Sequence, residues 1–187
     1  MPYLFKASFM KTASIHDIKQ ELKHSQPAVL LELCLRLAKY KKDNKELLAY
    51  LLFDAHDLQA YMASVKEHVD SLFADVNTNN AYFAKKSLVK ILTITNKHIK
   101  YTASKQAEVE LLAYFCTKLK DTGITMPAGS ALFNLYQRQL KKISVALEGM
   151  HEDLRHDYKT SIAYITDIAE NTALKSKAKA WRVIYPR

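Results

Sequence analysis

Glycine and proline are scarce in this sequence, which has 3 Gly and 4 Pro among 187 residues. Sheet-rich folds need many tight turns, and tight turns draw on these two residue types. Phosphate-binding loops need several glycines close together, because their backbone must approach the phosphate closely. The composition therefore argues against a β fold and against a glycine-rich nucleotide-binding loop.

Cysteine is also rare, and long apolar runs are missing. Cys34 and Cys116 both fall on apolar stripes with helical spacing, so we interpret both as reduced thiols in a protein core. No run reaches the ~20 apolar residues of a membrane-spanning helix. The first residues lack the continuous apolar segment of a signal peptide. We therefore expect a cytoplasmic protein without a membrane span.

Familiar catalytic motifs are missing too: there is no Gly-x-Ser-x-Gly and no His-Glu-x-x-His. The densest group of candidate metal ligands contains His151 and His156. Two histidines five residues apart do not share a helix face, so a site would need Glu152 or Asp153 beside His156 and a further ligand from elsewhere. Solvated acidic residues at a helix start explain the same pattern. We expect a non-enzyme without cofactor or metal, with a metal-dependent hydrolase as an alternative.

What the sequence does contain is apolar spacing of helical period along most of its length. Ser14 and Asp57 suit helix starts, Pro27 suits a first turn, and Gly123 suits a helix end. A polar break at 77–80 separates two stretches of similar helix content. The pattern predicts an all-α fold of about eight helices. Four of them begin after Ser14, at Pro27, after the turn at 41–44 and after Asp57, and the other four span about 81–101, 105–121, 131–148 and 152–170.

The stretch 27–54 is apolar nearly all round, with a turn predicted at Lys41 to Asn44. Asp43 and Glu46 have the spacing of a capping box for the second helix. Helices without a broad polar face are normally buried by other helices. We therefore predict that this stretch is the central αα-hairpin of the protein.

The connections are short, so consecutive helices are expected to form antiparallel αα-hairpins. Such hairpins stack into a right-handed α-α superhelix of the HEAT type or into a closed helical bundle, and the chain length slightly favours the superhelix. We predict one domain, with an arm at 1–13, a helical core at 14–170 and a basic, aromatic tail at 171–187. The tail contains Trp181 and is expected to cover the last hairpin.

One helix face is strongly basic. Lys86, Lys90, Lys97 and Lys100 recur at helical spacing on the outer side of the helix at 81–101. Lys85 and Lys105 extend this face. A row of this kind can follow the phosphates of a nucleic acid, although a solvated lysine face has the same pattern. The net charge of +9 also favours acidic partners.

A buried polar pair is the remaining candidate site. His98 projects into the apolar stripe of its helix, and Glu108 projects onto the stripe of the next helix. If the two helices face each other, the side chains meet in a buried pair whose pKa values would be shifted. A structural role for such a pair is the alternative to a catalytic one.

Parts of the sequence also resemble a known group of proteins. The run from Leu30 to Phe53, the segment Val109 to Cys116 and the segment Leu135 to Gln139 are similar to those of small all-helical bacterial proteins of unknown function. The resemblance covers residues 25–165 and implies an all-helical fold but no activity. At the level of architecture, the paired helices are similar to HEAT or armadillo solenoids, which suggests binding.

These observations favour a non-enzymatic module that binds or scaffolds another protein in the bacterial cytoplasm. Nucleic-acid binding through the lysine face at Lys86 to Lys100 is the second hypothesis. The two differ in their salt dependence, because neutralising phosphates releases counterions.

Overall fold

The computed structural model describes residues 12–171, with side chains up to residue 166, and it is all-helical as predicted. Most of the predicted arm at 1–13 and tail at 171–187, including Trp181, lies outside the described residues. None of the described helices combines the length and the apolar character that a bilayer crossing needs. The chain contacts form two compact units, divided between Ala49 and Tyr50. A single domain stays a prediction, and each unit is described by itself.

The first unit contains α1 (Ile15–His24), α2 (Pro27–Tyr40) and α3 (Lys42–Ala49). The helix start predicted at Ser14 is confirmed. Its Oγ accepts a hydrogen bond from the Asp17 N–H at 3.2 Å, while the Asp17 carboxylate accepts from the Ser14 N–H at 3.1 Å. This reciprocal capping box satisfies two N–H groups that the helix leaves free. α2 begins at Pro27 as predicted and packs against α3.

The prediction that the 27–54 hairpin lies buried at the centre is wrong. No residue of α2 or α3 is buried. Within this unit α2 packs on α3, and one neighbouring helix covers only one stripe of an all-round apolar surface. The turn is also shorter than predicted, because α3 already begins at Lys42, and Asp43 therefore lies inside its first turn.

The second unit begins with a π-helix, η1 (Tyr50–Asp54), and continues with six α-helices. Asp57, Asn80, Ser104 and Ser130 each cap the helix that follows with a side-chain oxygen, which explains where four of the six begin. The bounds are α4 (Leu58–Ala74), α5 (Ala81–Thr102), α6 (Lys105–Asp121), α7 (Ala131–Glu148), α8 (Glu152–Asp157) and α9 (Lys159–Asn171).

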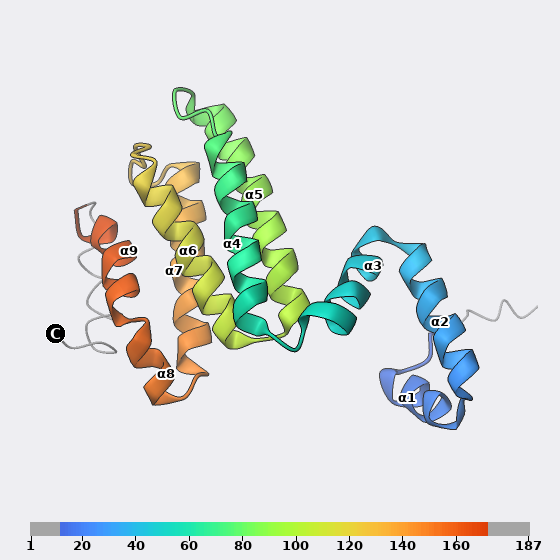
Figure 1. Ribbon diagram of the computed structural model, residues 1–187. Helices are drawn as coiled ribbons and strands as arrows, with labels where there is room; N and C mark the ends of the chain where they lie inside the picture. Colours follow the sequence, from blue (N-terminus) through green and yellow to red (C-terminus); the bar gives the residue numbers. More distant parts are fainter. Residues whose placement is uncertain (1–11, 172–187) are drawn as a thin grey trace, which may run out of the picture. The chain divides into compact units, whose positions relative to one another are not determined.

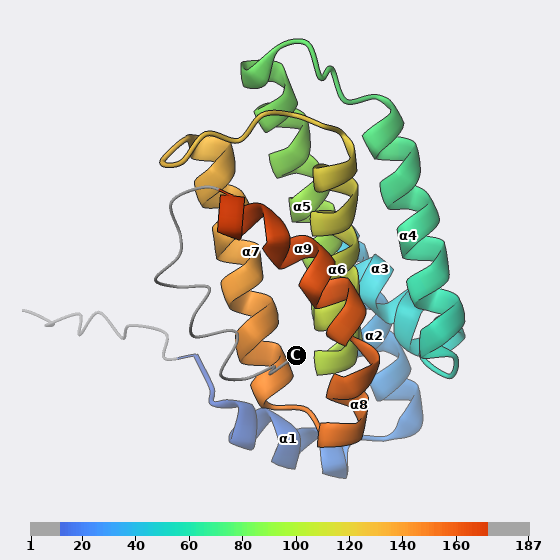
Figure 2. The same ribbon diagram turned by 90° about the vertical axis from the view of Figure 1, so that its left-hand side faces the viewer.

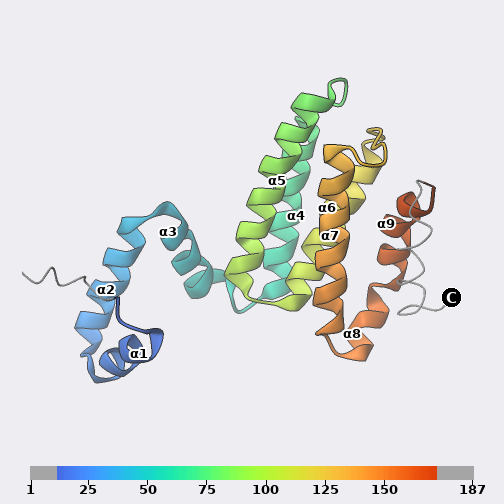
Figure 3. The ribbon, with the colours of Figure 1, turned by 180° about the vertical axis from the view of Figure 1, so that it is seen from behind.

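The helices of the second unit form two layers. Figure 1 shows α4 and α6 on the near side, and Figure 3 shows α5 and α7 on the near side of the opposite view. The turned view in Figure 2 places α9 beside α6, in agreement with their contacts. Side chains that join helices of the same layer are a nearly constant distance apart in sequence, 44 residues for Lys66 and Glu110 and 46 for Asn96 and Lys142. The unit is therefore a stack of helix pairs.

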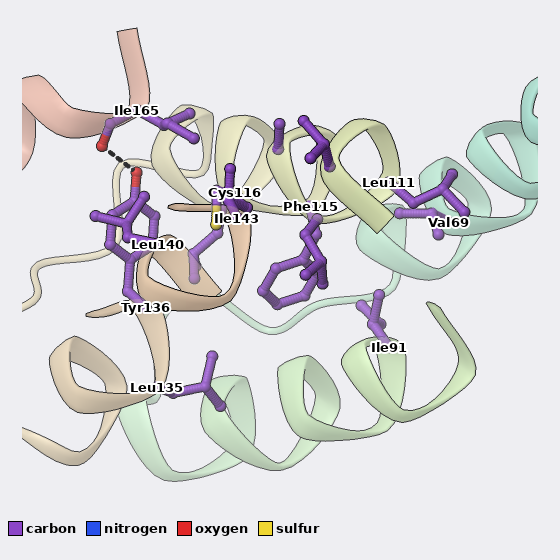
Figure 4. Close-up of a cluster of buried hydrophobic side chains, with 14 of the residues drawn as sticks. Val69, Ile91, Leu111, Phe115, Cys116, Leu135, Tyr136, Leu140, Ile143 and Ile165 are labelled. Atoms are coloured by element: carbon purple, nitrogen blue, oxygen red, sulfur yellow. Dashed lines mark hydrogen bonds between the residues drawn. The ribbon is translucent and has the colours of Figure 1, made fainter. Parts of the chain in front are cut away.

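The helix at the centre of this stack is α6, which packs against α4, α5, α7 and α9. Figure 4 shows Phe115 in the middle of the core. Its ring lies 5.6 Å from that of Phe73 on α4. α6 carries apolar residues on nearly every side because it has neighbours on nearly every side. Its buried residues are Ala107, Val109, Leu111, Leu112, Ala113, Phe115, Cys116 and Leu119.

Two further predictions need correction. The helix predicted at 152–170 is broken into α8 and α9 at Tyr158. The two cysteines also differ: Cys116 is buried in α6 as predicted, whereas Cys34 is exposed on α2. Both thiols were assigned to the core because both lie on apolar stripes, but only the stripe of α6 is covered by other helices. Burial also raises the pKa of Cys116, so this thiol stays protonated.

Candidate binding surfaces

The predicted lysine face lies on the outer side of α5. Lys86, Lys90 and Lys100 are exposed, and Lys97 is half-buried. The opposite side of α5 faces the core through Ala84, Leu88, Ile91 and Thr95, which are buried. This division follows from the helical period, because residues three or four apart share a face.

The structure adds α7 to this face, which sequence analysis missed. Lys142 Nζ on α7 donates to Asn96 Oδ1 on α5 at 3.4 Å, and Figure 3 shows α5 and α7 on the same side of the second unit. The spacing of the basic residues in α7 could have shown a second basic face, but not that it lies beside the first. We define the basic surface as Lys85, Lys86, Lys90, Lys97, Lys100, Arg138, Lys141 and Lys142.

The basic surface is almost free of acidic residues. The α5 sequence contains no Asp or Glu, and that of α7 contains only Glu148, its last residue. Like charges one turn apart, such as Lys86 with Lys90, oppose helix formation by ~0.2–0.5 kcal/mol per pair. Surfaces that serve only to keep a protein in solution usually mix the two signs of charge. A cluster of this kind has the charge to hold an acidic ligand.

In the layer formed by α4 and α6, opposite charges neutralise one another. Lys66 on α4 contacts Glu110 on α6 at 2.5 Å, and the Tyr158 hydroxyl donates to the same carboxylate at 3.1 Å. Asp70 contacts Lys118 at 2.8 Å and accepts from the Tyr114 hydroxyl at 2.7 Å. These bonds tie α4, and the junction between α8 and α9 at Tyr158, to α6. We assign them a structural role, because each carboxylate already has a cation and a hydroxyl beside it.

The Asp70 carboxylate makes stability depend on pH. Burial raises its pKa, but the hydrogen bonds from Lys118 and Tyr114 outweigh burial, so the pKa lies below its ordinary value. The unfolded chain therefore takes up this proton first as the pH falls, and the stabilisation present above the ordinary pKa is lost below it. Because the Asp70 side chain is 42% exposed, we expect its carboxylate to contribute less than about 1 kcal/mol to the free energy of unfolding.

The measurement is the free energy of unfolding by urea between pH 7 and pH 3. Replacing Asp70 by asparagine should make the protein lose less stability over this range than the wild type loses. Asp54→Asn, at an exposed position of η1, is the matched control and should leave the wild-type slope unchanged. An Asp70→Asn slope equal to that of the wild type would contradict the assignment.

His98 belongs to an aromatic cluster at the α4–α5 contact. Its Nδ1 lies 2.8 Å from the Tyr61 hydroxyl. The rings of His68 and Tyr101 are edge-on to its imidazole, with centroids 6.4 and 5.8 Å away. Glu108 lies in the first turn of α6, where an acidic residue is favoured by the helix dipole. A bond between His98 and Glu108 stays a prediction, and the partner given by the structure, Tyr61, lies on a different helix.

The histidines considered for a metal site are exposed. His151 Nδ1 lies 3.2 Å from Asp153 Oδ2, with the two side chains 77% and 90% exposed. His156 is exposed as well. Within the part of the chain that the structure describes, no three His, Cys, Asp or Glu side chains come together as metal ligands would. The hydrolase alternative has no assembled metal site in this part of the protein.

A second candidate surface is apolar and lies on the first unit. α1 and the start of α2 border an open groove of about 470 Å³. Its lining combines apolar side chains with two lysines: Ile15, Ile18, Leu22, Leu30, Lys19 and Lys23. Further along α2, Leu31 and Leu37 are 63% and 61% exposed. Contiguous exposed apolar side chains of this kind usually mark an interaction site.

Comparison with protein-family models, with curated proteins and with solved structures finds no match for this chain. The resemblance to small helical bacterial proteins and to HEAT-like solenoids agrees with the all-helical fold and otherwise stays a prediction.

Proposed function

We propose that this protein is a non-enzymatic binding module that holds an amphipathic helix of an acidic partner protein in the groove between α1 and α2. One observation carries the proposal: helices α1 to α3 have no buried residue while they expose many large apolar side chains. Burying exposed apolar surface contributes ~25 cal/mol per Å² of buried area, which is a strong driving force for association. A partner that covers it is therefore strongly favoured.

The groove itself suggests the chemistry of that partner. Ile15, Ile18 and Leu22 lie on one face of α1 and line the groove. An apolar lining of this kind accepts the apolar anchors that an amphipathic helix carries at i, i+3, i+4 and i+7. Lys19 and Lys23 border the same groove and favour carboxylates on the flank of the bound helix. A helix with leucines on one face and glutamates beside them fits both features.

The second unit would act as the rigid scaffold of the module. Its helix pairs pack in two layers with a nearly constant spacing, which supports the HEAT-like superhelix among the two predicted architectures. Extended stacks of this kind present surfaces rather than enclosed sites. A cytoplasmic location is part of the same proposal.

A designed peptide tests the groove directly. Its helix would carry leucines at i, i+3, i+4 and i+7 and glutamates on the flanks, with a fluorophore for anisotropy and a scrambled peptide as the reference. We expect Leu22→Glu to weaken binding of the designed peptide by at least about 10-fold, because it places a charge in an apolar contact and repels the peptide.

Leu154→Glu is the matched control, since Leu154 is the same residue type, is 42% exposed as Leu22 is 40% exposed, and lies on α8 in the second unit. It should leave the affinity within about 2-fold. Equal binding of the designed and scrambled peptides, or equal losses in the two variants, would overturn the proposal. Circular dichroism must show the same helix content and melting temperature in both variants.

A further inference from the structure

We infer that the basic surface on α5 and α7 is a second binding site, which holds the phosphate backbone of a duplex nucleic acid without reading its sequence. This site lies wholly within the second unit and does not depend on the groove of the first unit. The inference starts from charge: eight basic side chains lie on two adjacent helices whose only acidic residue is Glu148.

The dimensions of the surface fit a backbone. Lys86 and Lys100 are fourteen positions apart on one helix, which corresponds to about 21 Å at 1.5 Å per residue. Arg138, Lys141 and Lys142 add a second row on α7, which reaches α5 through the bond from Lys142 to Asn96. Two such rows can contact several phosphates of a duplex at once.

The residue types favour backbone contact over base recognition. Lysine is a flexible point charge, whereas base edges are usually read by planar Arg, Asn or Gln side chains. Seven of the eight residues are lysines, and Arg138 Nε already donates to the backbone carbonyl of Asn134 at 3.2 Å. Such a surface positions a nucleic acid but does not discriminate between sequences.

The residue composition of the basic surface favours a nucleic acid over an acidic protein as the ligand. It also favours a duplex over a single strand. Protein interfaces are depleted in lysine and enriched in aromatic and apolar residues, yet the large exposed apolar side chains among these basic residues are valines, Val89 and Val145. Single strands stack their bases on aromatic side chains. Tyr82 and Phe83, the exposed aromatic residues of α5, lie in its first turn rather than between the lysines.

The experiment is an anisotropy titration of a labelled 20-base-pair DNA duplex at several salt concentrations between 50 and 200 mM. With about 6 phosphate contacts, the affinity should fall ~10³-fold over this range. Lys86→Glu with Lys90→Glu should lower the slope of log affinity against log salt by about 2 and weaken binding at 50 mM by ~10-fold or more. Both lysines are exposed, so the fold should be retained.

Lys45→Glu with Lys159→Glu changes the net charge by the same amount at exposed positions off the basic surface. This control should keep the wild-type slope. The inference is overturned if the control loses as much as the α5 variant, if the duplex does not bind at 50 mM, or if polyglutamate or a single strand binds more tightly than the duplex. None of these outcomes affects the peptide test of the groove.

Discussion

Replacing Phe115 by alanine should destabilise the protein by about 3–5 kcal/mol, the cost of removing a large aromatic side chain from a packed core. Phe115 is fully buried in α6, the helix that contacts α4, α5, α7 and α9. A cavity at this position removes contacts from several helices at once. Chemical unfolding followed by circular dichroism measures the loss.

Phe53 provides a matched control, because it is the same residue type but 68% exposed on η1. We expect Phe53→Ala to change the free energy of unfolding by less than about 0.5 kcal/mol. If Phe115→Ala prevents folding, Phe115→Leu should still unfold reversibly with a smaller loss. Similar losses for Phe53→Ala and Phe115→Ala would restore the 27–54 stretch as a core element and would contradict the central place of α6.

The second large effect is expected from Tyr136→Phe. The buried Tyr136 hydroxyl donates to the Ile165 carbonyl at 2.6 Å and so joins α7 to α9 (Figure 4). Removing the hydroxyl deletes one buried hydrogen bond between the two helices, which costs about 0.5–1.5 kcal/mol. Burial also raises the pKa of Tyr136. The hydroxyl therefore remains a donor, and the loss should be the same at pH 6 and pH 8.5.

Tyr164 is the control for this variant. Its hydroxyl donates to Asp121 at 2.5 Å, but the side chain is 44% exposed, so water can replace the lost bond. Tyr164→Phe should therefore cost less than about 1 kcal/mol. A larger loss for Tyr164→Phe than for Tyr136→Phe would show that the α7–α9 contact depends on surface bonds and not on the buried one.

Helix positions were predictable from the sequence, because their ends carry local signals. α6 and α7 have the predicted bounds, and Ser14, Asp57 and Pro27 mark helix starts in the structure as they do in the sequence. The break at Tyr158 was missed, since neither Gly nor Pro marks it. Local chemistry thus defined these helix starts well, whereas the cap predicted at Asp43 failed because Asp43 lies inside the first turn of α3.

Burial could not be predicted in the same way, and one repeated pentapeptide shows why. Residues 46–50 and 110–114 both read Glu-Leu-Leu-Ala-Tyr. In α6 the two leucines and the alanine are buried, whereas in α3 the equivalent residues are only half-buried and the helix changes to a π-helix at Tyr50. The number of neighbouring helices, which five residues do not encode, decides the difference.

The same limit applies to the candidate surfaces. The lysines of α5 were recognised because they follow one another on a single helix, whereas the tertiary bond from Lys142 to Asn96 is what connects Arg138, Lys141 and Lys142 on α7 to them. The Tyr61 partner of His98 also comes from another helix. Periodicity within one helix was sufficient for five of the eight residues of the basic surface, and tertiary contacts supplied the other three.

The nearly constant spacing of contacts in the second unit also determines how this unit would respond to tension. Lys66 with Glu110 and Asp121 with Tyr164 are 44 and 43 residues apart, so each helix pair is fastened chiefly to the next pair. Pulled from its two ends, such a stack yields pair by pair from an end. Each step would release about 150 Å of extended chain at ~3.5 Å per residue, so the unit would lengthen in discrete increments instead of rupturing at once.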